Sequence, residues 1–212
     1  MARSRRWKSQ TRIRPQYKRF LVIVEGDVTE REYIEAVKRL RKIRSVNVHI
    51  EHEHTDPLGI VKDAKRMRNE AAKTDPYDEV WCVFDVEAKL SQQARPGFAD
   101  ALSMARGARI RCAVSNPCFE VWLLLHGVER TAWIDSDSAQ RRCAELGITQ
   151  MGHGKHINAP EALISNSFPA AKARAVGLDH MHDTNGTTRP EDRNPSSAVY
   201  NLIDAIFSAF PT

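Results

Sequence analysis

The sequence predicts an α/β fold in which a parallel sheet carries helices on both faces, with a helical appendage at the C-terminus. Short apolar runs rich in β-branched residues alternate with segments whose apolar residues recur at helical spacing. Each apolar run ends abruptly in polar residues, which is typical of buried parallel strands. Strands that alternate with helices are joined by crossover connections, and these connections bring the carboxyl ends of the strands to one edge of the sheet.

Four strands are predicted in the first 128 residues. Three of them are apolar runs, FLVIV, EVWCVF and IRCAV, and the fourth, VNVHIEH, alternates between apolar and polar residues with a period of two. β-Branched and aromatic residues are common in these runs, and such residues fit a pleated, buried surface. The expected strands span residues 20–24, 46–52, 79–84 and 110–114.

A helix is predicted after each of these strands. Thr29 is the expected cap of the first helix, and acidic residues in its first turn complement the helix dipole. Pro57 and Gly59 are expected in a loop before the second helix, which Asp75-Pro76 ends because the residue before a proline disfavours helical backbone. The expected helices span residues 29–43, 60–73 and 98–106, and from 118 or 119 to 126.

Residues 129–212 form a mostly helical extension that is expected to pack on the sheet domain, residues 19–128. Pro160 suits the first position of a short helix that ends near residue 164. Pro169 is expected to break this pattern and to start a second helix, which stops at Gly177. The other expected elements are a helix over 139–146, a loop over 180–193 and a closing amphipathic helix over 198–210.

The composition is that of a soluble globular protein, with 42% hydrophobic and 28% charged residues among 212. No apolar run approaches the roughly 20 residues that a membrane helix needs, and the basic N-terminus lacks the apolar segment of a signal peptide. The four cysteines, Cys82, Cys112, Cys118 and Cys143, form no CxxC pair. We therefore expect a cytoplasmic protein with reduced cysteines.

Residues 1–18 form a basic arm, expected to be flexible, within a chain of net charge +5. The arm contains no acidic residue, and a segment with so many like charges does not fold on its own. Basic arms commonly bind phosphates, so Arg12, Arg14 and Lys18 are predicted to bind nucleic acid. The alternative is a solubilising leader that binds nothing specific.

Carboxylates follow the predicted strands. Glu25 follows the first strand, Asp85 and Glu87 follow the third, and Glu120 follows the fourth, just after Asn116. If the sheet is parallel, these acids converge and raise one another's pKa unless a cation compensates their charge. Oxygen-only ligands favour Mg²⁺ or Mn²⁺, so the four acids predict a metal site. The alternatives are solvated loop carboxylates and, for Glu120, an acid that only complements a helix dipole.

Four motifs in order, VEGDVTEREYIEAV, YDEVWCVFDVE, SNPCFEVWLLLH and NPSSAVYNLI, resemble the RloB-like family. Those proteins are bacterial, are associated with phage defence and restriction loci, and are related to the AbiL abortive-infection component. The turn at Glu25-Gly26 and the pair Asp85-x-Glu87 resemble a Toprim domain, the metal-binding fold of topoisomerases, primases and overcoming-lysogenization-defect nucleases. The usual Toprim pair is Asp-x-Asp, and here the second acid is one methylene longer. The resemblance runs from about residue 19 to the C-terminus and implies a Toprim-like, Rossmannoid sheet.

The resemblance also implies an activity. In the Toprim pattern Glu25 is the general acid or base, or a metal ligand, and Asp85 and Glu87 hold Mg²⁺. The chain is then expected to be a metal-dependent endonuclease that cleaves RNA, with tRNA as one candidate, or DNA, as an effector of anti-phage defence. Two alternatives stay open: a non-catalytic nucleic-acid-binding module, and an effector gated by a partner such as an ATPase.

Two further groups of residues carry weaker predictions. Lys89 and Lys155 are candidate phosphate contacts, the latter in the loop 152–156 (GHGKH). A solvated lysine is the more common case for Lys89, and a surface loop of no function is slightly favoured for the GHGKH motif. Pairs of histidines raise the alternative of a structural zinc site, yet none stands with a cysteine at finger spacing. The pairs are His52 and His54, His153 and His156, and His180 and His182.

Overall fold

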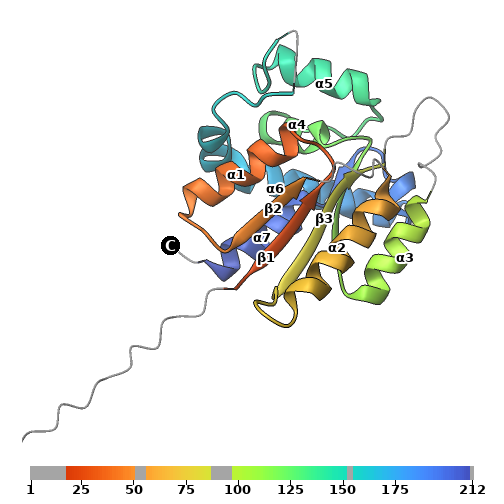
Figure 1. The fold of residues 1–212 in the computed structure, drawn as a ribbon. Coiled ribbons are helices and arrows are strands. Elements are labelled where there is room, and N and C mark those ends of the chain that lie inside the picture. The colour runs from red at the N-terminus through yellow and green to blue at the C-terminus, as the bar shows by residue number, and fades with distance from the viewer. Residues whose placement is uncertain (1–17, 51–55, 87–96, 152–154, 211–212) are drawn as a thin grey trace, which may run out of the picture.

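The computed structural model of the protein describes residues 18–50, 56–86, 97–151 and 155–210 (Figure 1). Within these residues five strands form one sheet in the order β2-β1-β3-β4-β5, and the first four in sequence are parallel, which confirms the predicted α/β fold. The strands are β1 (Phe20–Val24), β2 (Val46–Ile50), β3 (Glu79–Asp85), β4 (Arg111–Asn116) and β5 (Ser196–Ser197).

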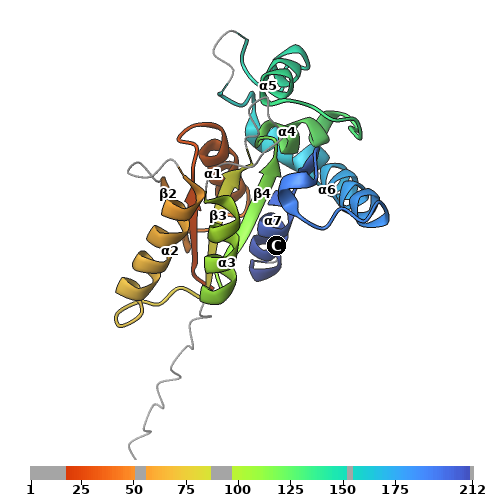
Figure 2. The same ribbon diagram turned by 90° about the vertical axis from the view of Figure 1, so that its right-hand side faces the viewer.

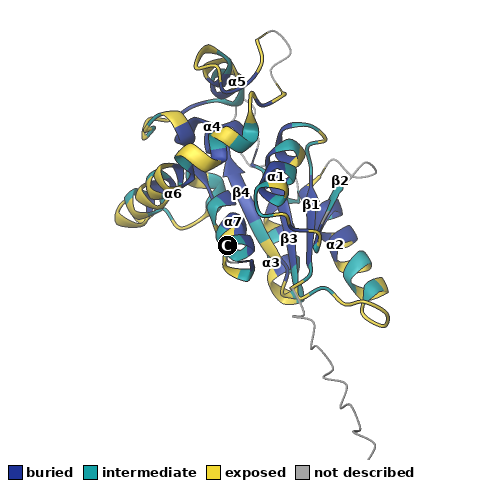
Figure 3. Cartoon of the chain, turned by 90° about the vertical axis from the view of Figure 1, so that its left-hand side faces the viewer, coloured by how far each residue is buried: buried dark blue, intermediate teal, exposed yellow. Residues whose placement is uncertain are grey.

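Helices cover both faces of this sheet, as Figures 2 and 3 show. One face packs against α2 and α3, and the other packs against α1, α4, α6 and α7, with α5 joined to α4 beyond the carboxyl ends of the strands. The helices are α1 (Thr29–Leu40), α2 (Pro57–Ala71), α3 (Phe98–Ala108), α4 (Glu120–Gly127), α5 (Ser136–Glu145), α6 (Pro160–Thr184) and α7 (Val199–Ala209), with a 3₁₀ turn η1 (Pro190–Asp192).

The alternation of side chains along β1 explains why its sequence is apolar without a break. Leu21 and Ile23 enter the core under α2 and α3, whereas Phe20, Val22 and Val24 enter the core under α1 and α7. All five are fully buried. A strand with helices on both faces has no solvent side, so each position has to be apolar.

The start of α2 and the cap of α1 differ from the prediction. α2 begins at Pro57 rather than at residue 60, because Asp56 caps it by accepting a 3.0 Å hydrogen bond from the backbone amide of Gly59. A proline at the first helical position needs no amide partner. At α1 the cap position is Val28, and the Thr29 hydroxyl instead donates to the backbone carbonyl of Lys155 over 2.8 Å.

The prediction that Pro169 and Gly177 interrupt the C-terminal helices is wrong, because α6 continues through both and ends at Thr184. Ser165, whose carbonyl loses its partner to Pro169, is exposed and can be hydrated. The expected loop over 180–193 therefore begins later. A continuous stripe of buried side chains against α4 favours the unbroken helix: Ile164, Phe168, Ala171, Ala175, Leu178 and His182.

The C-terminal part of the chain also completes the sheet, which the sequence did not predict. β5 pairs antiparallel with β4, Ser115 opposite Ser197, and the two buried hydroxyls lie 3.0 Å apart. The cysteines are free, as expected. In the part of the chain that the structure describes, no helix has both the length and the apolar composition to cross a membrane.

Candidate functional site

Acidic side chains from separate segments meet at the carboxyl ends of β1, β3 and β4. The register of the parallel strands brings the ends of β1 and β3 side by side, and the amide of Glu25 donates to the carbonyl of Val83 over 3.1 Å. The Glu25 carboxylate in turn accepts a hydrogen bond from the amide of Asp85 over 3.4 Å. The predicted meeting of Glu25 and Asp85 at one edge of the sheet is what the geometry shows.

Asp85 is the most constrained of these acids. Its Oδ2 accepts a 3.1 Å hydrogen bond from the amide of Phe119, just before α4. Its Oδ1 is buried and has no hydrogen-bond partner among the described residues. Burial, followed by the charges of Glu30, Glu120 and Glu25, raises the pKa of Asp85 well above its usual range. A buried oxygen without a donor, surrounded by like charges, is a position that favours a cation or a proton.

Glu30 also belongs to this group of acids, and the sequence did not predict it. It lies in the first turn of α1 and is 7% exposed. Burial raises the pKa of Glu30 to about 7, with further contributions from Glu120 and Glu25. The missed signal was its spacing, because Glu30 shares a helix face with the core residues Tyr33 and Val37. Its position in the first helical turn suggested a dipole-complementing acid instead.

Gly26 gives Glu30 the room it needs. A methyl group added at Gly26 would overlap the carboxylate of Glu30. The backbone at Gly26 does not have a positive φ. The glycine therefore permits the close approach of a side chain, the carboxylate of Glu30.

Glu120 is the first residue of α4 and is 5% exposed. Asn116, the last residue of β4, precedes it and donates 3.0 Å hydrogen bonds to the carbonyls of Pro190 and Glu191, which anchors this turn to η1. Glu120 acts electrostatically on both Glu30 and Asp85. We call these four acids the acid cluster: Glu25, Glu30, Asp85 and Glu120.

A buried hydrogen-bond chain holds α1 against α4 one turn from the acid cluster. Ser167 donates to the carbonyl of Leu163 over 2.6 Å, so its hydroxyl accepts from Nδ1 of His126 over 2.7 Å. Nε2 of His126 then accepts from the Tyr33 hydroxyl over 2.9 Å. Burial lowers the pKa of His126 to about 4, so the ring is neutral at physiological pH. Tyr33 also packs edge-on against Phe119 and Trp122.

Lys155 lies beside the acid cluster, on a segment that is hydrogen-bonded to α1. Its backbone carbonyl accepts from Thr29, and Glu32 binds the next two residues, His156 Nδ1 over 2.5 Å and the amide of Ile157 over 2.8 Å. The Lys155 side chain is exposed, and its charge lowers the pKa of Glu30 against the effects of burial. The charge of Lys155 therefore acts on the acid cluster, and its predicted contact with a phosphate stays a prediction.

One predicted site residue, Lys18, lies at the opposite edge of the sheet. Lys18 stands before β1 and pairs with Glu79 over 3.2 Å at the amino end of β3. The length of β1 separates it from Glu25 by roughly 20 Å. The residues Arg12, Arg14, Glu87 and Lys89 lie outside the described residues.

Two of the histidines considered for a zinc site, His182 and His156, have other partners. Nε2 of His182 bonds to the carbonyl of Pro195 over 2.9 Å, and His156 bonds to Glu32. His52, His54 and His153 lie outside the described residues. Cys118 is buried near Glu120 and Asp85, and burial raises the pKa of its thiol, which disfavours the reactive thiolate.

The donor set of the acid cluster fits a hard divalent cation. All four members are carboxylates, their charges repel one another, and Oδ1 of Asp85 lacks a donor among the described residues. Across the described residues, no three histidine, cysteine, aspartate or glutamate side chains stand in an arrangement that could already hold an ion. The cluster fits in charge and atom type, and its side chains would have to close around a cation.

One comparison with known proteins agrees with the motifs quoted above. A search of curated proteins found no match to this chain. The family described as RloB-like protein matches residues 20–206, which includes every member of the acid cluster. The match covers most of the 212 residues, and the chain therefore belongs to the RloB-like family.

Proposed function

We propose that this protein hydrolyses phosphodiester bonds of nucleic acid with the help of a divalent metal ion at the acid cluster. One observation supports this proposal above the others. Four carboxylates from separate turns and helices converge at the carboxyl edge of a parallel sheet, with part of the cluster buried. This is the edge where sheets of this class bind ligands. A fold gains no stability from burying repelling acids, so the arrangement points to a bound cation.

Each acid has a distinct part in this proposal. Asp85 would hold the metal through Oδ1, while the Phe119 amide fixes its other oxygen. Glu25 and Glu120 would complete the oxygen ligands from the two sides, together with Glu87 if it reaches the site. A bound Mg²⁺ or Mn²⁺ would polarise the phosphodiester and favour deprotonation of an attacking water.

Glu30 is suited to move a proton in the same reaction. Its pKa of about 7 is close to the pH at which a general acid or base works best. Glu25, the residue that the Toprim pattern assigns to this step, remains the other candidate. Lys155 would neutralise charge on a substrate phosphate, because its side chain is exposed beside Glu30.

The substrate is proposed to be RNA, including tRNA, or DNA. The basic arm and Lys155 provide cationic groups, and the association of RloB-like proteins with phage defence and abortive infection suggests an effector that attacks an essential nucleic acid. A Toprim-type reading of the sheet supports the same chemistry. A partner such as an ATPase would then restrain the nuclease until infection.

The second candidate is a module that binds nucleic acid or a partner without catalysis. The observation that favours it is the spread arrangement of the acids, since no three histidine, cysteine, aspartate or glutamate side chains among the described residues could hold an ion as they stand. In that case the buried acids would be protonated or would bind a basic group of a partner.

A metal-dependent cleavage assay on mixed RNA and DNA pools tests the proposal. Cleavage is expected with Mg²⁺ or Mn²⁺, to stop with a chelator, and to fall by orders of magnitude in Asp85→Asn and Glu25→Gln. Glu35→Gln is the matched control, since Glu35 lies on α1 and pairs with Lys38 over 2.7 Å. Metal binding without cleavage of any pool, alone or with a partner, would favour the binding module.

A further inference from the structure

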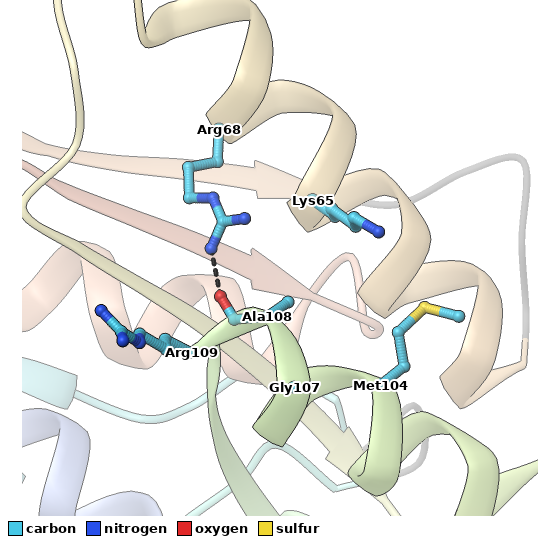
Figure 4. Close-up of a pocket in the computed structure, with 6 residues that line it drawn as sticks. All are labelled: Lys65, Arg68, Met104, Gly107, Ala108 and Arg109. Atoms are coloured by element: carbon cyan, nitrogen blue, oxygen red, sulfur yellow. Dashed lines mark hydrogen bonds between the residues drawn. The ribbon is translucent and has the colours of Figure 1, made fainter.

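A basic pocket lies between α2 and α3, remote from the acid cluster (Figure 4). Its volume is about 510 Å³, within the range of small-molecule sites. Arg109 stands just before β4, so the pocket is at the amino end of that strand, whereas Glu120 follows its carboxyl end. The lining residues are Lys65, Arg68, Met104, Gly107, Ala108 and Arg109.

The cationic side chains of the pocket are not neutralised by its surroundings. The two acids of the neighbouring helical turns, Asp63 and Glu70, both pair with Arg66, over 2.8 and 3.2 Å. Lys65 and Arg109 are exposed and form no ion pair with any described residue. Three cationic residues therefore line one cavity whose lining contains no carboxylate.

Arg68 is held in place by the opposite helix. One of its guanidinium nitrogens donates to the carbonyl of Ala108, the last residue of α3, as the dashed line in Figure 4 shows. A guanidinium has five N–H donors, so this contact leaves others available. The bond orients the guanidinium into the space between the helices before any ligand arrives.

Two residues at the end of α3, Arg109 and Gly107, shape the pocket. Arg109 follows α3 with φ +56°, a left-handed conformation that favours glycine at helix ends. Gly107 lies in the last turn of α3, where an added methyl group would meet nothing within 4 Å. Packing therefore does not require a glycine at position 107. Because glycine has no side chain, this position adds no atoms to the cavity.

We propose that this pocket is a second binding site, for a phosphate-bearing ligand held by Lys65, Arg68 and Arg109. Arginine forks match phosphate oxygens in pairs, and lysine adds a point charge. The ligand is a free polyphosphate, such as a nucleoside triphosphate, or the phosphate backbone of a nucleic acid. The site depends on neither the metal nor the reaction proposed above.

Binding of inorganic tripolyphosphate, measured by calorimetry with a chelator present, tests the site. The chelator removes metals that would carry phosphate to the acid cluster. Arg109→Gly is expected to weaken binding about tenfold, the loss of one charge-assisted contact. The glycine suits the left-handed backbone, so the variant should fold at least as well as the wild type. Gly107→Glu, which adds an anion to the cavity, should abolish binding.

Matched controls distinguish binding at this site from nonspecific attraction of the phosphate to the positively charged protein. Lys42 follows α1 with φ +52° on the other face of the sheet, so Lys42→Gly removes the same charge from the same backbone conformation. Lys42→Gly and Gly107→Ala should bind tripolyphosphate like the wild type. Equal loss in Arg109→Gly and Lys42→Gly would overturn the proposal.

A single-stranded oligonucleotide in the same assay identifies the source of the phosphate. If tripolyphosphate does not bind, and binding of the oligonucleotide weakens only in Arg109→Gly and Gly107→Glu, the ligand is a nucleic-acid backbone. If tripolyphosphate binds and the oligonucleotide is unaffected by both variants, the ligand is a free polyphosphate. Absence of any variant-sensitive binding by either probe would exclude the site.

Discussion

The backbone amide of Asp85 donates a hydrogen bond to Oε2 of Glu25 over 3.4 Å and so joins the carboxyl ends of β3 and β1. Two acids distant in sequence therefore lie at the same edge of the sheet. The charges of Glu30 and Glu120 also act on the carboxylate of Asp85, so the protonation of the four acids is coupled.

Divalent metal should stabilise the protein. A ligand that binds only the folded state at 100 times its dissociation constant adds about 2.7 kcal/mol, or roughly 5–10 °C in Tm for a chain of this size. The shift should be larger at about pH 8 than at about pH 6, because Glu30 is ionised at the higher pH and its negative charge then attracts the cation. Thermal melts with Mg²⁺ or Mn²⁺ measure it, with sodium chloride of equal ionic strength as control. An equal shift in Asp85→Asn would exclude this site.

Glu30→Gln should stabilise the metal-free protein at alkaline pH. The folded-state pKa of about 7 lies above the usual 4.5, so the ionised carboxylate opposes folding, and stability falls as pH rises between these values. The variant should therefore gain about 2–3 kcal/mol at about pH 8 and little at about pH 5. Urea unfolding at the two pH values, with a chelator, measures the difference. A gain that does not depend on pH would contradict the raised pKa.

Glu120→Gln distinguishes a site residue from a helix-dipole residue. If Glu120 only complements the dipole of α4, the substitution costs no more than about 1 kcal/mol and leaves metal binding unchanged. Its burial and its effect on Asp85 favour the site role, so we expect weaker metal binding and cleavage reduced by orders of magnitude in a folded variant. Isothermal titration with Mn²⁺ measures the first effect directly.

Tyr33→Phe should loosen the contact between α1 and α4. It leaves the buried Nε2 of His126 without its 2.9 Å donor, at a cost of about 1–3 kcal/mol. Because Glu30 is one turn away on α1, the metal-induced Tm shift should also shrink. Tyr200→Phe is the matched control: it removes a 2.7 Å bond to Asp179 between α7 and α6 and should leave the metal response unchanged.

Removal of residues 1–17 should weaken nucleic-acid binding without unfolding the protein. The cut keeps the ion pair of Lys18 with Glu79. On duplex DNA each lost phosphate contact should reduce the salt dependence by about 0.9 in slope of log affinity against log salt. Filter binding over a salt series measures it, and an unchanged slope would assign the arm to a leader without a binding role.

The sequence by itself determined the strand–helix order and the carboxyl-edge position of Glu25 and Asp85. Apolar runs without alternation occur where helices cover both faces of a strand, so FLVIV and EVWCVF could be assigned before any coordinates were known. Parallel strands share one carboxyl edge, and this fact alone brought the two acids together.

Only the tertiary structure decided the rest. The unbroken α6 depends on packing against α4, which outweighs the local preference of Pro169 to end a helix. The burial of Glu30 depends on Gly26 and on the approach of Glu25 and Glu120, and pKa shifts arise from such distances rather than from spacing along the chain. Likewise, the pairing of β5 with β4 joins segments about eighty residues apart through only two residues, too few for a strand pattern to appear in the sequence.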